Sequence, residues 1–172
     1  MNEIDLGAVK IVLAATPSAS GKGTISQSAT YATAEEAAAH APFALVLPGN
    51  PLPGHELMDA AVLSSPAKAA ALTYKEQAGH RHYVVAESPL GPDVTEGKPQ
   101  VSAIGQALSE ATVGGQPAAL LRGANNGQHP QPLTLFWTRD GILFQVAGMG
   151  YSQEDLTTAA QEFACLAGGC DN

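Results

Sequence analysis

The sequence predicts an α+β fold built on an antiparallel sheet. Segments with strand-like composition recur roughly every 8–12 residues, as in an antiparallel meander. Gly-Gly and Asp-Gly dipeptides separate two pairs of these segments, which is typical of tight hairpins. Two further segments begin with helix-capping residues. We therefore expect about six to eight strands and two helices in a chain of 172 residues, a length that suits one domain.

The N-terminal third of the chain gives the weakest pattern. Ala8–Ala15 is a short apolar strand candidate, and the Thr-, Pro- and Ser-rich stretch Thr16–Ser28 reads as a loop or tail, with Thr24–Ser28 as an optional short strand. We therefore assign residues 1–33 to an N-terminal extended segment or tail. Residues 34–172 are assigned to a single α+β domain.

The first helix is expected at Ala34–His40. Thr33 and Glu36 have the spacing of a capping box, in which each side chain satisfies a free backbone N–H of the first turn. Three strand candidates follow the proline-rich step after this helix. They are His55–Ser64, Lys68–Glu76 and His82–Glu87.

Pro- and Gly-rich composition predicts a long loop over Ser88–Gly105. Two hairpins are then expected, with strands at Leu108–Val113, Gln116–Arg122, Leu133–Thr138 and Ile142–Ala147. The last helix begins near Ser152, which has an acidic residue three positions on. Its stripe of Leu156, Ala159, Ala160 and Phe163 would cover a sheet.

The few aromatic residues should anchor the packing, because only 5% of the chain is Phe, Trp or Tyr. Strand alternation places Trp137 on one face of its strand and Phe136 on the other. Phe136 is thus either a packing residue, which we favour, or part of an apolar groove. The candidate core anchors or groove residues are Phe43, Phe136, Trp137, Phe144 and Phe163.

Charge and cysteine content narrow the choice of partner and compartment. The net charge of −8 and the scattered basic residues argue against nucleic acid and acidic membrane surfaces. No apolar run approaches the ~18–20 residues that span a bilayer. Acidic residues before Ala8, and Lys10 within the apolar run, argue against a secretory signal.

The two cysteines lie near the C-terminus. Cys165 and Cys170 flank two glycines that could reverse the chain, so either a disulfide or two free thiols is expected.

No motif supports catalysis, a cofactor or a metal site. Thr16–Thr24 resembles a phosphate-binding loop, but it lacks the first glycine and a following helix. His80 and His82 could share a strand face, yet no third ligand follows by spacing. We therefore expect no catalytic, cofactor-binding or metal-binding residues, and interpret both histidines as surface residues.

The order of several short motifs resembles a bacterial family of domains of unknown function. This family occurs at the C-terminus of anti-sigma-factor-like and lipoprotein-sorting-like proteins and is similar to the LolA and MucB/RseB superfamily. The matching segments are Pro48–Gly54, Leu72–Tyr74, Val113–Ala118, Leu135–Trp137, Asp140-Gly141 and Ser152–Leu156. The match covers about residues 34–164, while the terminal Cys pair and residues 1–33 have no counterpart.

The resemblance implies a non-catalytic, extracytoplasmic domain with a curved antiparallel sheet and helices packed on one face. It implies a sensory or regulatory interaction module with a protein partner. The alternative is a carrier that holds a lipid or another apolar ligand against the concave face of the sheet. The aromatic-poor composition offers little lining for such a cavity and favours the module. Any membrane anchor would lie outside these 172 residues.

Overall fold

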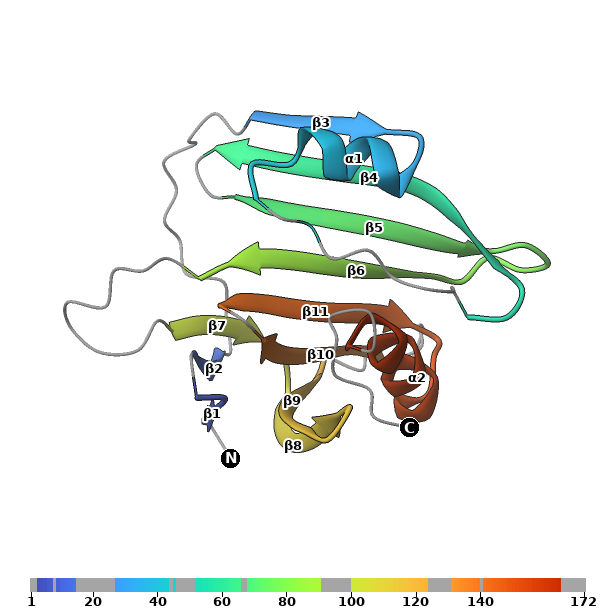
Figure 1. Cartoon of the computed structure of the whole chain (residues 1–172). Coiled ribbons are helices and arrows are strands. Elements are labelled where there is room, and N and C mark those ends of the chain that lie inside the picture. Colours follow the sequence, from blue (N-terminus) through green and yellow to red (C-terminus); the bar gives the residue numbers. More distant parts are fainter. Residues whose placement is uncertain are drawn as a thin grey trace.

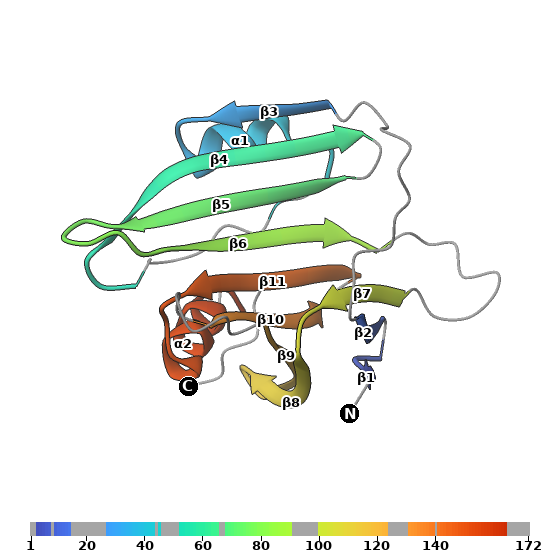
Figure 2. The ribbon, with the colours of Figure 1, turned by 180° about the vertical axis from the view of Figure 1, so that it is seen from behind.

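A computed structural model of the chain describes residues 3–7, 9–14, 27–43, 45, 52–65, 68–90, 100–123, 131–139 and 141–164. These residues form two sheets, of eight and three strands, and two helices (Figures 1 and 2). The helices are α1 (Ala34–His40) and α2 (Gln153–Ala164). The strands are β1 (Glu3–Asp5), β2 (Lys10–Ala14), β3 (Gln27–Tyr31), β4 (His55–Ser65), β5 (Ala69–Glu76), β6 (His82–Pro89), β7 (Gln100–Ile104), β8 (Ala107–Val113), β9 (Gln116–Arg122), β10 (Pro132–Arg139) and β11 (Ile142–Met149).

The large sheet has the strand order β3-β4-β5-β6-β11-β10-β9-β8, and every neighbouring pair is antiparallel. Two runs of consecutive strands, β3–β6 and β8–β11, therefore meet where β6 pairs with β11. The two-residue turn between β8 and β9 holds Gly114 and Gly115 at φ angles of 58° and 81°, which side-chain-bearing residues rarely adopt. The predicted α+β class with an antiparallel sheet is confirmed.

Both helices begin at the predicted caps. The Thr33 hydroxyl accepts a hydrogen bond from Glu36 N at 3.1 Å, and the Ser152 hydroxyl accepts one from Asp155 N at 3.1 Å. Each bond satisfies one of the backbone donors left free in a first helical turn. These local bonds explain why the helix starts could be predicted from the sequence.

The two helices pack on the same face of the large sheet, as predicted. Ala37 of α1 and Leu156 and Ala160 of α2 are buried in one core with side chains from the large sheet. We call this the helix-side core. At its centre the stacked rings of Trp137 and Phe144 lie 5.3 Å apart.

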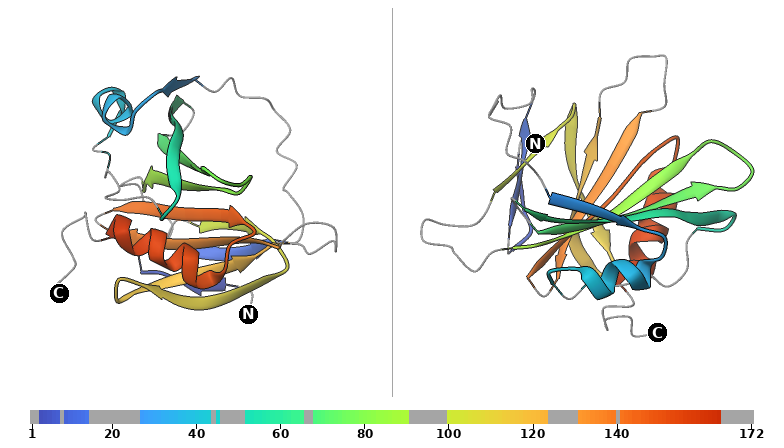
Figure 3. Two further views of the ribbon diagram at one scale, coloured as in Figure 1. Left: turned by 90° about the vertical axis from the view of Figure 1, so that its right-hand side faces the viewer. Right: turned by 90° about the horizontal axis from the view of Figure 1, so that it is seen from above.

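The opposite face of β8–β11 is covered by the small sheet, whose strand order is β1-β2-β7. Strand β2 pairs antiparallel with β1 and parallel with β7. Seen from above, α1 and the N-terminal strands lie on opposite sides of the large sheet (Figure 3). The resulting second core, here called the small-sheet core, contains Ile4, Leu6, Val9, Ile11, Leu108, Ala119, Leu121, Phe136 and Leu143.

Two sequence predictions are corrected by the small sheet. The segment Ser88–Gly105 was predicted to be a loop, but it contains β7, and β6 extends to Pro89. Residues 1–33 were assigned to a separate segment or tail, yet β3 is an edge strand of the large sheet and Ile11 is fully buried. The boundary drawn after residue 33 thus divides residues that pack together. Both errors arise because the partners of β2, β3 and β7 are distant in sequence.

Candidate functional site

Side chains of the chain itself fill the helix-side face of the large sheet and the opposite face of β8–β11. Trp137 and Phe144 fill the helix-side core, and Phe136 is buried in the small-sheet core. Phe136 is thus a packing residue, which is the favoured reading of the sequence. Phe43 is half-buried in the segment after α1. The Phe163 side chain and both cysteines, Cys165 and Cys170, lie outside the described residues.

A polar aromatic cluster occupies the helix-side face where β4 and β6 begin. It consists of His55, Tyr74, Tyr83 and Tyr151, which are buried, and of Arg81 at the surface. The Tyr74 and Tyr83 rings stack 5.2 Å apart, and the Tyr151 ring meets Tyr83 edge-on at 5.8 Å. Pattern analysis of the sequence did not find this cluster, because its members come from four separate segments.

Hydrogen bonds fix the histidine within this cluster. His55 Nδ1 lies 3.1 Å from the Pro53 carbonyl oxygen, which can only accept, so this nitrogen carries a proton. In the neutral ring Nε2 then accepts a hydrogen bond from the Tyr151 hydroxyl at 2.8 Å. The Tyr83 hydroxyl accepts from Leu52 N at 3.0 Å. The cluster therefore connects the start of β4 to Tyr151, which lies two positions before the first residue of α2.

Arg81 closes the cluster on its solvent side. Its guanidinium lies 4.6 Å from the centre of the Tyr151 ring and donates to the Gly150 carbonyl at 3.0 Å. Both Nε and Nη2 lie 2.6 Å from Glu76 Oε2. Burial raises the pKa of Tyr151 to about 12, although Arg81 opposes the rise. Burial also raises the pKa values of Tyr74 and Tyr83. The tyrosines therefore stay protonated at neutral pH and act as packing and hydrogen-bonding groups.

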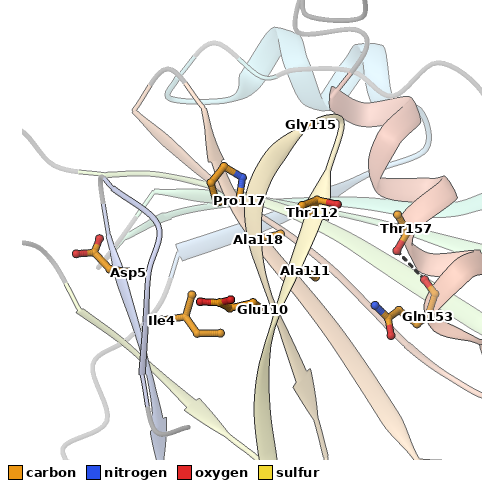
Figure 4. Close-up of a pocket in the computed structure, with 10 residues that line it drawn as sticks. All are labelled: Ile4, Asp5, Glu110, Ala111, Thr112, Gly115, Pro117, Ala118, Gln153 and Thr157. Carbon is orange, nitrogen blue, oxygen red and sulfur yellow. Dashed lines mark hydrogen bonds between the residues drawn. The ribbon is translucent and has the colours of Figure 1, made fainter.

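A second feature is a cleft of about 590 Å³ beside β8, the last strand of the large sheet (Figure 4). Three parts of the chain line it. They are Ile4 and Asp5 of β1, Gln153 and Thr157 of α2, and Glu110, Ala111, Thr112, Gly115, Pro117 and Ala118 of the β8–β9 hairpin. Because β1 and α2 lie on opposite faces of the large sheet, a cleft that touches both passes around the edge of β8.

The outer edge of β8 carries no paired strand in the described structure. In an antiparallel ladder, every second residue directs its backbone N–H and C=O away from its partner strand. Counted from the two-residue Gly114-Gly115 turn, these residues of β8 are Leu108, Glu110 and Thr112. A row of backbone donors and acceptors therefore faces the cleft.

The side chains of β8 divide between the two walls of this cleft. Leu108 belongs to the small-sheet core and Val113 to the helix-side core, so even-numbered side chains point toward β1 and odd-numbered ones toward α2. Figure 4 shows Glu110 beside Ile4, and Ala111 on the side of Thr157. Glu110 and Thr112 are exposed.

The charged residues that line the cleft, Asp5 and Glu110, are both acidic. The Asp5 carboxylate accepts a hydrogen bond from Gly7 N at 2.8 Å. No ion pair involves Glu110 within the described ranges. The cleft thus combines an open strand edge, a small apolar patch and the negative charge of Glu110.

Other sites suggested by the sequence do not assemble in the structure. His80 and His82 are both exposed near the turn between β5 and β6. Among the described residues, no three His, Cys, Asp or Glu side chains converge as metal ligands would, and no helix is long and apolar enough to cross a bilayer. The phosphate-loop-like segment Thr16–Thr24 lies outside the described residues.

Comparisons of the chain with protein-family models, with curated proteins and with solved structures found no match. The fold and its cleft therefore carry the functional argument.

Proposed function

We propose that this chain is a non-catalytic interaction module that binds a protein partner in the cleft beside β8. The carrying observation is that the chain's own elements cover the helix-side face of the large sheet and the opposite face of β8–β11, whereas the edge of β8 opens into a cleft of about 590 Å³. Edge strands beside an accessible groove are a recurring means of holding an extended partner segment. A sensory or regulatory role outside the cytoplasm is part of this proposal.

The His55–Tyr151 pair resembles an acid–base pair, but its contacts support a structural role. His55 and Tyr151 are 9% and 5% exposed, and both His55 nitrogens are already engaged within the protein. A general base must reach a proton on its substrate. Tyr151 borders a separate cleft of about 440 Å³, but His55 does not line it. The pair therefore suits a fold-stabilising role.

A carrier of lipid or another apolar ligand is less well supported. A carrier needs a dry cavity lined by bulky apolar side chains. The helix-side core is instead filled by Trp137, Phe144 and their neighbours, and the cleft beside β8 is lined in part by Asp5 and Glu110. Mass spectrometry of organic extracts from the purified protein tests this alternative. Lipid retained in stoichiometric amount would favour the carrier over the module.

Site-specific photo-crosslinking tests the module directly. A photoreactive residue replaces Thr112 in the cleft, and the matched control replaces Met58, which is 53% exposed on β4. We expect one discrete protein adduct in cells from position 112 and none from position 58. Equal adducts from both positions would count against the cleft as the binding site.

The extracytoplasmic part of the proposal has an independent test. A Cys165–Cys170 disulfide would fit an oxidising compartment. Thiol titration of the protein isolated from its native host under denaturing, non-reducing conditions should then find no free thiol. Two reactive thiols would remove this argument for an extracytoplasmic location.

A further inference from the structure

The open backbone edge of β8 and the carboxylate of Glu110 indicate what kind of partner segment the cleft would bind. This inference rests on the proposed function, because it names the kind of partner segment that the module would take. We propose that the occupant is an extended segment of a partner protein that pairs with β8 as a ninth strand of the large sheet and places a Lys or Arg opposite Glu110.

The extended conformation follows from the backbone of β8. Leu108, Glu110 and Thr112 direct their N–H and C=O groups to the open edge, as the alternation from the Gly114-Gly115 turn requires. Only an extended chain can meet donors and acceptors spaced at every second residue. Walls on both faces, from Ile4 on one side and Thr157 on the other, would hold such a chain in the plane of the sheet.

The basic residue follows from the position of Glu110. Residues that lie opposite each other on neighbouring strands share a face and touch, and opposite charges there are favourable. A Lys or Arg opposite Glu110 would point to the β1 side, toward Asp5. No ion pair engages Glu110 within the described ranges, so this carboxylate is available to the partner.

The residues that flank the basic position are also constrained. Positions two residues away from it share the β1 side, where Ile4 lines the cleft and Thr112 is exposed. The intervening positions point to the α2 side and meet Ala111, Gln153 and Thr157. An alternation of small apolar and hydroxyl residues around a central Lys or Arg fits both walls.

A second copy of the same chain is a poorer occupant. In an antiparallel pairing of two β8 strands about their central residue, Glu110 would lie opposite Glu110 of the copy, and like charges in that position are destabilising. The net charge of −8 adds repulsion between copies. The same negative charges favour the binding of a basic partner segment.

Three synthetic peptides test the proposal on the full chain. Each has seven residues of alternating Thr and Val, with Lys, Gln or Glu at the centre, and each is titrated into ¹⁵N-labelled protein while amide shifts are recorded. We expect shifts confined to β1, β8 and the first turns of α2. The Lys peptide should bind about two- to five-fold more tightly than the Gln peptide, as one solvent-accessible ion pair allows. The Glu peptide should bind most weakly.

Variants of the protein separate charge from backbone pairing. Glu110→Lys should reverse the order of the Lys and Glu peptides, while the matched change Glu56→Lys on the exposed surface of β4 should leave it unaltered. Thr112→Pro removes one outward N–H and should weaken all three peptides. A folded spectrum of Glu110→Lys keeps the test valid if the proline variant does not fold.

Several outcomes would overturn the proposal. Equal affinity for the three peptides would reject the basic preference while leaving the interaction module intact. Shifts elsewhere on the surface, or no binding, would reject strand addition at β8. Shifts of the β8 amides with protein concentration alone, abolished by Thr112→Pro, would make a second copy the occupant. The crosslinking experiment judges the module separately, because it does not depend on the partner's chemistry.

Discussion

Trp137, the single tryptophan of the chain, is the largest side chain that is fully buried. It stacks on Phe144, yet within the described structure its Nε1–H is buried without a hydrogen-bond partner. A buried donor left unpaired costs about 1–3 kcal/mol. The packing of Trp137 therefore stabilises the folded protein, whereas its unpaired N–H destabilises it.

Substitutions at Trp137 should reveal both contributions. Trp137→Ala leaves a large cavity and should lower the free energy of unfolding by roughly 3–5 kcal/mol. Trp137→Phe keeps much of the packing and removes the unpaired N–H, so the loss should be only about 1–2 kcal/mol. Urea unfolding followed by circular dichroism measures both. A loss in Trp137→Phe clearly above this range would indicate that the indole N–H is satisfied.

The buried tyrosines predict how stability depends on alkaline pH. Their pKa values are raised in the folded protein, that of Tyr151 to about 12, so the unfolded chain loses these protons first as pH rises above 10. The stabilisation is fully present below pH 10 and is lost as pH rises toward 12. Urea unfolding at steps from pH 9 to 11.5 should show a falling free energy of unfolding.

The Tyr151→Phe variant identifies the group responsible. Removal of its hydroxyl should reduce the slope of stability against pH above 10, and loss of the bond to His55 should cost about 1 kcal/mol at neutral pH. The control is Tyr31→Phe, on the edge strand β3 outside the cluster. An unchanged slope in Tyr151→Phe would exclude Tyr151 as a contributor.

At the scale of elements, α2 has two structural tasks. Its Leu156 and Ala160 complete the helix-side core, and its Gln153 and Thr157 form one wall of the cleft beside β8. Ser152 precedes the first residue of the helix as its N-cap, and its hydroxyl accepts a hydrogen bond from Asp155 N. The cap therefore determines where α2, and with it this wall of the cleft, begins.

Loss of this cap should destabilise the protein measurably. We expect Ser152→Ala to lower the free energy of unfolding by about 1 kcal/mol, because a first-turn N–H loses its partner. Thr158→Ala is the matched control, since its hydroxyl bonds only to Glu154 O within the same helix and alanine favours helix. In thermal unfolding, the Tm of Thr158→Ala should equal or exceed that of the unmodified protein, and the Tm of Ser152→Ala should be lower. The opposite ranking would argue against the assigned cap.

At the scale of the whole molecule, half of the large sheet, strands β8–β11, is covered on both faces. The helix-side core and the small-sheet core share the strands β8–β11, so side chains on both faces of these strands are buried. Strands β3 and β8 are the two edge strands of the large sheet, and the cleft lies beside β8. The cleft is the reason that we propose binding at the edge of β8.

The small sheet should belong to the same cooperative unit as the large sheet. Ile11 of β2 is fully buried in the small-sheet core. Ile11→Ala should lower the free energy of unfolding by about 2–5 kcal/mol, and Ile11→Val by about 0.5–1.5 kcal/mol. Denaturant unfolding followed by Trp137 fluorescence reports on the other core. If Ile11→Ala leaves the midpoint of the Trp137 fluorescence transition unchanged, the two sheets unfold independently.

Local signals explain which parts of the fold could be predicted. Thr33 and Ser152 mark helix starts through bonds that span three residues, and Gly114-Gly115 determines a hairpin through its own backbone angles. Strand β7 and the polar aromatic cluster could not be predicted in this way. The partners of β7 lie about ninety positions earlier in β2, and His55 meets Tyr151 across 96 positions.

The sequence by itself determined the α+β class, the eight neighbouring segments that became β4–β6, β8–β11 and α2, and the cap of α1, because periodicity and turn chemistry act over a few residues. The tertiary structure alone decided that β6 pairs with β11, that a small sheet covers the back face of β8–β11, and that β8 remains an open edge beside an acidic cleft. Those features depend on contacts between residues far apart in the chain, whose pairing no local pattern specifies.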